Sequence, residues 1–251
     1  MTRAPRRFGL WFWTFILFML VLTGLFGWLG KWQLDRLGEK EALIAAVDRQ
    51  MAEQPYDLPA LDQWGLFSAD TFAYHRMIAT GTYLNDATVL VFTNLATPNG
   101  SFSGPGYWVM TPLKLDSGGI IFINRGFIPQ SSSATFLGAP GPSGTQTISG
   151  IARAPEPANA FTPGPDKAKR IEWVRDPVRL AALAGITDPV FALTLDAPAG
   201  EAGALPQGGE TVVEFPNNHL GYAFTWFGFA LITPLLLAYW VWRQVRPRPE
   251  T

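Results

Sequence analysis

The stretches FGLWFWTFILFMLVLTGLFGWL (residues 8–29) and LGYAFTWFGFALITPLLLAYWVW (residues 220–242) decide the architecture of this chain. Neither stretch contains a charged residue. Each is about 22 residues long, which is enough for a helix to cross a hydrocarbon core of about 30 Å. A helix buried in a soluble core rarely stays apolar on every side over such a length. We therefore predict two membrane-spanning helices with one domain between them.

The first apolar stretch also has to be compared with a cleavable signal sequence. It is longer than the apolar region of such a signal, and no small-x-small cleavage site follows Leu29. The pair Arg6-Arg7 resembles a twin-arginine signal, but the residues around it fit poorly. We interpret the stretch as an uncleaved anchor. Because the short basic segment before it leaves no room for an organelle transit peptide, we expect a bacterial inner-membrane protein.

Charge predicts the orientation of the two spans. The two ends of the chain, outside the apolar stretches, contain six arginines and one acid, Glu250. Residues 31–219 carry 13 of the 19 basic and 19 of the 20 acidic residues, a net charge of −6. Basic tails stay in the cytoplasm, so the middle domain is expected in the periplasm. Its negative charge also gives no basic face for nucleic acid.

The predicted organisation follows from these spans and from the pattern after them. Apolar residues at helical spacing continue the first helix to about Gln50. The segments expected in order are a cytoplasmic tail (1–7), a first span (8–29), a juxtamembrane helix (30–54), a periplasmic β-rich domain (55–219), a second span (220–242) and a cytoplasmic tail (243–251).

Within the middle domain the pattern changes to strands. Residues 74–83 and 88–92 are separated by the turn-forming pair Asn85-Asp86, which predicts one hairpin, and residues 107–115 and 120–124 predict a second. Further strands are expected at 147–152 and 190–195, a short helix at 176–184, and loops at 98–106 and 130–144. The predicted fold is a mainly antiparallel β (α+β) domain, barrel- or sandwich-like, between two transmembrane helices.

Composition excludes several kinds of chemistry. The chain has no cysteine and two histidines, so the usual Cys/His zinc sites cannot form. Its five methionines are scattered, which argues against a copper carrier. No nucleophile elbow, phosphate-binding loop or dinucleotide fingerprint is present. We therefore expect a protein that is not an enzyme.

His219 is the candidate ligand, since it stands at the outer boundary of the second span. On a helix it shares one face with Tyr222 and Trp226, which are three and seven residues further on. An imidazole beside aromatic rings suits the iron of an amphipathic porphyrin. The alternative is an interfacial polar residue that caps the helix or binds a backbone carbonyl. Small residues on the spans, such as Gly221 and Gly228, suggest close packing of the two helices or of a partner helix.

Arg125 is a second candidate polar residue, because it comes directly after a strongly apolar strand. On its own it is equally explained as a structural arginine that binds loop carbonyls or a carboxylate.

Four segments in order resemble the Surfeit locus protein 1 family, also known by its yeast name Shy. They are Gly30-Lys31-Trp32-Gln33-Leu34-Asp35-Arg36-Leu37, Pro105-Gly106-Tyr107-Trp108-Val109-Met110-Thr111-Pro112-Leu113, Ile123-Asn124-Arg125-Gly126-Phe127-Ile128-Pro129 and Asn217-Asn218-His219-Leu220-Gly221-Tyr222-Ala223-Phe224-Thr225-Trp226-Phe227-Gly228. The family often has Trp where this chain has Phe127.

The resemblance implies an assembly factor for haem–copper cytochrome c oxidase. It implies that the protein receives haem a and assists its insertion into the large catalytic subunit of the oxidase. His219 would be the axial ligand of the haem iron. Tyr222 and Trp226 would flank the porphyrin, and Arg125 and Trp32 would meet its propionates or the domain surface. Expected partners are that subunit, haem a synthase and membrane lipids. Two alternatives remain, a membrane scaffold that stabilises the oxidase subunit without binding haem and a membrane-anchored exported enzyme.

Overall fold

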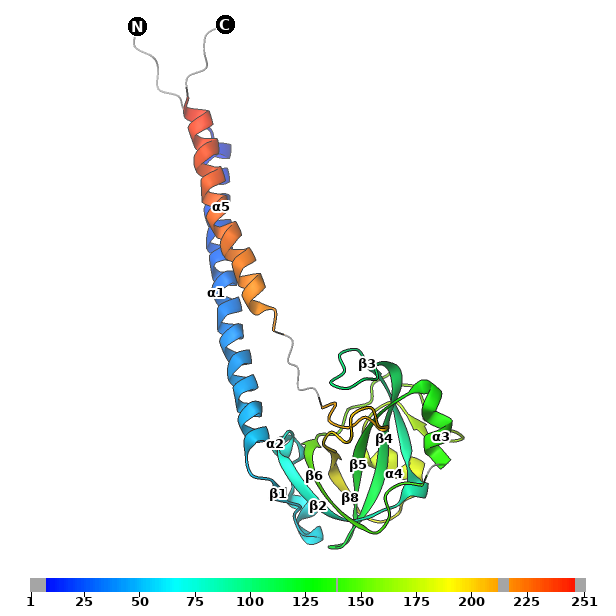
Figure 1. Ribbon diagram of the computed structural model, residues 1–251. Helices are drawn as coiled ribbons and strands as arrows, with labels where there is room; N and C mark the ends of the chain where they lie inside the picture. Colours follow the sequence, from blue (N-terminus) through cyan, green and yellow to red (C-terminus); the bar gives the residue numbers. More distant parts are fainter. Residues whose placement is uncertain (1–7, 139, 212–216, 247–251) are drawn as a thin grey trace, which may run out of the picture. The chain divides into compact units, whose positions relative to one another are not determined.

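The computed structural model describes residues 8–138, 140–211 and 217–246 (Figure 1). The chain divides into two units. We call Met1–Ala46 with Glu214–Thr251 the helix-pair unit, and Val47–Val213 the β-domain. Each unit has its own contacts and is described separately.

The helix-pair unit contains the helix α5 (His219–Val245) and most of the helix α1 (Leu10–Ala52), whose last residues, from Val47 on, belong to the β-domain. Both are long and apolar enough to cross a membrane. Large apolar side chains along them are exposed, for example Trp11 at 78% and Leu231 at 65%, as expected for surfaces that lipid covers. The prediction that the first helix continues past the apolar stretch is confirmed, and α1 ends two residues beyond the expected Gln50.

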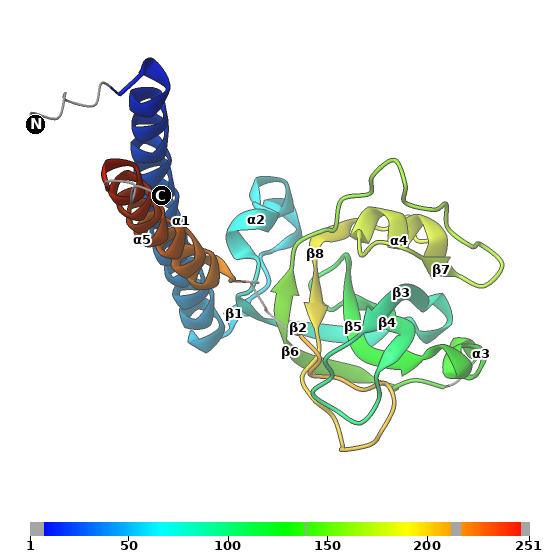
Figure 2. The same cartoon turned by 90° about the horizontal axis from the view of Figure 1, so that it is seen from above.

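Among its described residues the β-domain contains eight strands, three short α-helices and three 3-10 helices. Figure 2 shows the strands and α-helices of this domain from above. Its strands are β1 (Tyr56–Asp57), β2 (Arg76–Tyr83), β3 (Val89–Leu95), β4 (Gly104–Leu115), β5 (Ile120–Pro129), β6 (Thr145–Arg153), β7 (Ile171–Glu172) and β8 (Val190–Asp196). Its helical segments are η1 (Leu61–Leu66), α2 (Ala69–Phe72), η2 (Asn85–Ala87), η3 (Gln130–Ser132), α3 (Ser133–Gly138) and α4 (Pro177–Ala184).

All eight strands belong to one sheet, in the order β1-β2-β6-β8-β5-β4-β3-β7. An additional pairing of β2 with β4 closes β2, β6, β8, β5 and β4 into a ring. Most neighbours are antiparallel, and β5 with β8 is the parallel pair within the ring. This mixed, mostly antiparallel sheet between two apolar helices confirms the predicted fold class.

The main core lies among the five strands of the ring. It takes buried apolar side chains from each of them, including Met77, Leu113, Ile121, Ala152 and Phe191. A second cluster packs α4 on the sheet, with Leu180 and Phe122 both fully buried. Asp176 begins α4 as its N-cap, and its side chain accepts the backbone N–H groups of the next turn, as the sequence predicts.

The first predicted hairpin is wrong. β2 and β3 are joined by η2, but they do not pair with each other. Gly81–Tyr83 of β2 pairs with the end of β4, and Val89–Leu95 of β3 pairs with its start. They therefore follow one another along the same edge of β4, because the η2 turn offsets the chain without reversing it. The second hairpin, β4 with β5, is confirmed. The loop expected at 130–144 contains η3 and α3.

Candidate functional site

The four sequence motifs lie in the fold as two pairs. The first and last are on α1 and α5 of the helix-pair unit. The second and third are on the neighbouring strands β4 and β5, where Trp108 is the register partner of Phe127. The first and last motifs are far apart in the sequence and lie in the same unit, whereas the second and third are the two strands of one hairpin.

His219 is the first residue of α5 and contacts α1 through a side-chain hydrogen bond. Its Nδ1 atom lies 2.7 Å from Oε1 of Gln33. Gln33 is buried, with 8% of its surface exposed. The predicted alternatives of helix capping and of binding a backbone carbonyl differ from this contact, since the ring nitrogen meets a side-chain amide of the other helix.

Close approach of the two helices brings this pair together. A Cβ atom on Gly30 would lie 2.7 Å from the ring of Phe227, so the absence of a side chain there lets α5 come near. Trp226 stacks on Phe26 of α1 at 5.8 Å between ring centroids. Ala223, one turn after His219, is 2% exposed at the same contact. Apolar packing therefore supports the polar pair at the end of α5.

The other aromatic candidates of this unit are open. Tyr222 is 57% exposed and Trp32 is 41% exposed. Trp32 precedes Gln33 on α1, and the guanidinium of Arg36 lies 5.8 Å from its ring centroid. Exposed aromatic rings offer surfaces on which a flat apolar ligand can stack.

Arg125 belongs to the β-domain and stands in a β-bulge. Between Trp108 and Met110 the register of β4 against β5 shifts, so that Arg125 and Gly126 together oppose one residue. Gly126 has a φ of +131°, and a Cβ there would overlap the backbone of Gln207. The side chain of Asn124 accepts the Gly126 N–H at 3.1 Å. The Asn-Arg-Gly sequence thus builds the bulge that aims the arginine.

The guanidinium of Arg125 lies 5.6 Å from the ring centroid of Tyr83. Burial lowers the pKa of Arg125, and the nearby phenol acts in the opposite direction. Burial also raises the pKa of Tyr83 to about 12, although the positive charge of Arg125 opposes this. Among the described residues, the contact that Arg125 makes is with the ring of Tyr83, and its role, structural or ligand-binding, stays a prediction.

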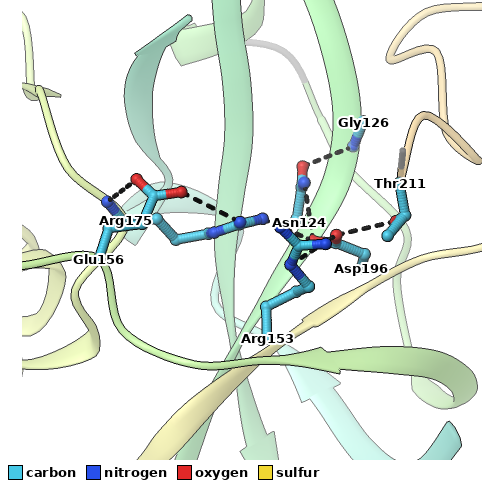
Figure 3. Close-up of polar contacts among 7 residues, drawn as sticks. All are labelled: Asn124, Gly126, Arg153, Glu156, Arg175, Asp196 and Thr211. Atoms are coloured by element: carbon cyan, nitrogen blue, oxygen red, sulfur yellow. Dashed lines mark hydrogen bonds and ion pairs between the residues drawn. The ribbon is translucent and has the colours of Figure 1, made fainter. Parts of the chain in front are cut away.

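A buried polar network that sequence analysis missed lies where the ends of β6 and β8 meet the middle of β5 (Figure 3). Asp196 accepts hydrogen bonds from Arg175 at 3.0 Å, Asn124 at 2.9 Å and Thr211 at 2.8 Å. Glu156 binds the other side of Arg175. The signal available in the sequence was an aspartate directly after an apolar strand, but its partners lie 15 to 72 residues away. The network ties strand ends together.

The chemistry open to these residues is narrow. No group of three His, Asp or Glu side chains in the described part of the chain is placed to hold a metal ion. His219 offers a single imidazole nitrogen, beside exposed aromatic rings and with its other nitrogen already bonded. This donor set fits the axial position of a porphyrin iron, where the macrocycle supplies the remaining ligands. His219 belongs to the helix-pair unit and Arg125 to the β-domain, so Arg125 is not assigned to this site.

Two helices long and apolar enough to cross a membrane, one of them beginning at a histidine, precede and follow a closed β-domain in the chain, which is consistent with a two-pass membrane protein. The chain belongs to the SURF1 family, whose model matches residues 20–231. A SURF1-like protein of Monosiga brevicollis is 33% identical over 95% of this chain and 89% of its own length. Surfeit locus protein 1 of Rattus norvegicus is 29% identical over 92% of this chain and 76% of its own length, and a SURF1-like protein of Rickettsia bellii is 25% identical over 86% and 85%.

Proposed function

We propose that this chain is an assembly factor for haem–copper cytochrome c oxidase that receives haem a and assists its insertion into the large catalytic subunit. His219 is the axial ligand of the iron in this proposal. A bound haem would supply the iron, and the chain would supply one imidazole to hold it. A single protein ligand suits transfer, because a second strong axial ligand would slow release.

The observation that carries the proposal is the environment of His219. Its ring lies at the first residue of α5, its Nδ1 atom is engaged by Gln33, and exposed aromatic side chains lie on the same helix. Tyr222 is proposed to stack on the porphyrin together with Trp226, which also packs on Phe26. Trp32 adds a third ring in the same unit. Arg125 is proposed to meet a carboxylate, such as a haem propionate or an acidic partner surface.

The proposed setting is a bacterial inner membrane. The two apolar helices are consistent with a two-pass protein, and the arginine-rich ends favour the cytoplasm for both termini. The β-domain then lies in the periplasm. Haem a synthase is the proposed source of haem, and membrane lipids surround α1 and α5.

The test is the visible spectrum of the full chain, purified in mild detergent from cells that make haem a. The proposal expects a haem band that His219→Ala removes while circular dichroism stays unchanged. His75→Ala is the matched control, since His75 is the other histidine and belongs to the β-domain. A band that survives His219→Ala would refute the ligand. A wild-type protein without haem would refute haem binding.

A scaffold that stabilises the oxidase subunit without binding haem is the second candidate. Cβ atoms added at Gly221 or Gly228 would meet nothing within 4 Å among the described residues, so these glycines are not the ones that bring α1 and α5 together. The surface of α5 at Gly221 and Gly228 is therefore open to a helix of another protein. The scaffold predicts normal oxidase haem content with His219→Ala and its loss with Gly221→Leu or Gly228→Leu.

A further inference from the structure

We infer that Gln33 is a positioning residue that fixes the tautomer of His219 and leaves the Nε2 lone pair free for a ligand. The inference deepens the proposed haem-handling function and rests on it for the identity of that ligand. The tautomer itself is a property of the chain and is measurable without haem.

The argument begins with the hydrogen bond. Nδ1 of His219 lies 2.7 Å from Oε1 of Gln33, and a carbonyl oxygen only accepts. With the Gln33 amide oriented in this way, Nδ1 carries the hydrogen. A neutral imidazole has a single N–H, so Nε2 is unprotonated. This is the form in which imidazole binds a metal, because a protonated nitrogen has no lone pair to donate.

Burial holds the amide in place. Gln33 is 8% exposed, and it follows Gly30 by one helical turn, where the ring of Phe227 fills the space of the missing side chain. A buried polar group without a partner is unfavourable, so the contact is favoured over an unpaired amide. Histidines that bind metals usually donate their second N–H to an oxygen of this kind.

The two side chains come from different helices, 186 residues apart in the sequence. The proton position on His219 therefore depends on how α1 meets α5. Gln33 acts through His219 and need not touch the ligand. A residue with only a structural role would support the helix contact but would leave the choice of protonated nitrogen unaffected.

The experiment is nitrogen NMR of the haem-free full chain in lipid nanodiscs, with ¹⁵N-labelled histidine. The chain has two histidines, so a His75→Gln background leaves one imidazole to observe. We expect hydrogen on Nδ1 and none on Nε2. Gln33→Leu should abolish this preference. Gln33→Glu should keep the hydrogen on Nδ1, because an ionised carboxylate accepts a hydrogen bond and cannot donate one.

Gln50→Leu is the matched control, the same substitution on the same helix about 25 Å along its axis from residue 33. Its nitrogen spectrum should equal that of the unmodified chain. A hydrogen on Nε2 in the unmodified chain would mean that the Gln33 amide donates, and would overturn the inference. An unchanged spectrum in Gln33→Leu would overturn it too.

Haem titration separates this inference from the proposed function. Gln33→Leu should weaken haem binding by about 10–100-fold, as loss of a partner behind a metal ligand does, and Gln50→Leu should not. A chain that binds no haem yet holds hydrogen on Nδ1 would refute the proposed function and support the tautomer assignment. Strong haem binding with hydrogen on Nε2 would do the reverse.

Discussion

The helix-pair unit and the β-domain each hold two of the four motifs, but the motif residues serve different purposes. In the β-domain they are explained by packing: Gly126 leaves room for the backbone of Gln207, and Phe127 is fully buried. In the helix-pair unit, Gln33 and His219 form a polar contact that two apolar helices do not need for packing. Gly126 and Phe127 therefore maintain the shape of the β-domain, whereas the contact between Gln33 and His219 is the one on which the proposed ligand site rests.

The largest effect that would sharpen this comparison is expected from Asp196→Ala. It leaves the buried guanidinium of Arg175 without its closest buried partner, which should cost about 3–5 kcal/mol of unfolding free energy. Urea unfolding of the full chain in detergent, followed by near-ultraviolet circular dichroism, measures it. Glu156→Ala is the control, because that side chain is 48% exposed and its loss should cost less than about 1 kcal/mol. Equal losses would contradict the network.

Gly126→Ala should come next, with a loss of about 2–4 kcal/mol. A side chain there combines backbone strain at φ +131° with overlap on Gln207. Gly104→Ala separates the two causes, because Gly104 has a φ of +88° but open space around it. It should lose about 1–2 kcal/mol from strain alone. The same unfolding assay applies, and a Gly126→Ala loss no larger than that of Gly104→Ala would rule out the overlap.

The two regions also differ in how far the sequence predicts them. Long apolar runs and strand alternation are local signals, so the helices, the β4–β5 hairpin and α4 were all predictable. The β2–β3 connection was not, because Asn85-Asp86 has the same turn chemistry whether the chain reverses or continues along β4.

The candidate site residues, too, were predictable where the signal is local in the sequence and not where it depends on a distant residue. His219 was visible from its place beside an apolar run. Gln33 was not singled out, since its partner lies 186 residues away. The contact of Arg125 with Tyr83 depends on a bulge that no local pattern reveals.

Tyr83 gives the β-domain a pH dependence of about 2–3 kcal/mol. Its pKa is about 12 in the folded chain and about 10 when unfolded, so the folded state holds its proton more tightly. The resulting stability is present below pH 10 and is lost as the pH rises from 10 to 12. Tyr83→Phe should flatten this decline in urea midpoints measured between pH 8 and pH 11.5. An equally steep decline in the variant would contradict the assignment.

The smallest stability effect is expected at the contact between Gln33 and His219. Side-chain hydrogen bonds between membrane helices average about 0.6 kcal/mol and reach about 1.7 kcal/mol. A double-mutant cycle of Gln33→Leu and His219→Ala, with unfolding by sodium dodecyl sulfate in mixed micelles, should give a coupling in that range. A coupling above about 3 kcal/mol would make the pair a structural tie comparable to Asp196 with Arg175. A small coupling together with a large loss of haem binding would show that the two polar contacts differ in purpose. The contact between Gln33 and His219 would then contribute little to holding the helices together and much to presenting an imidazole nitrogen.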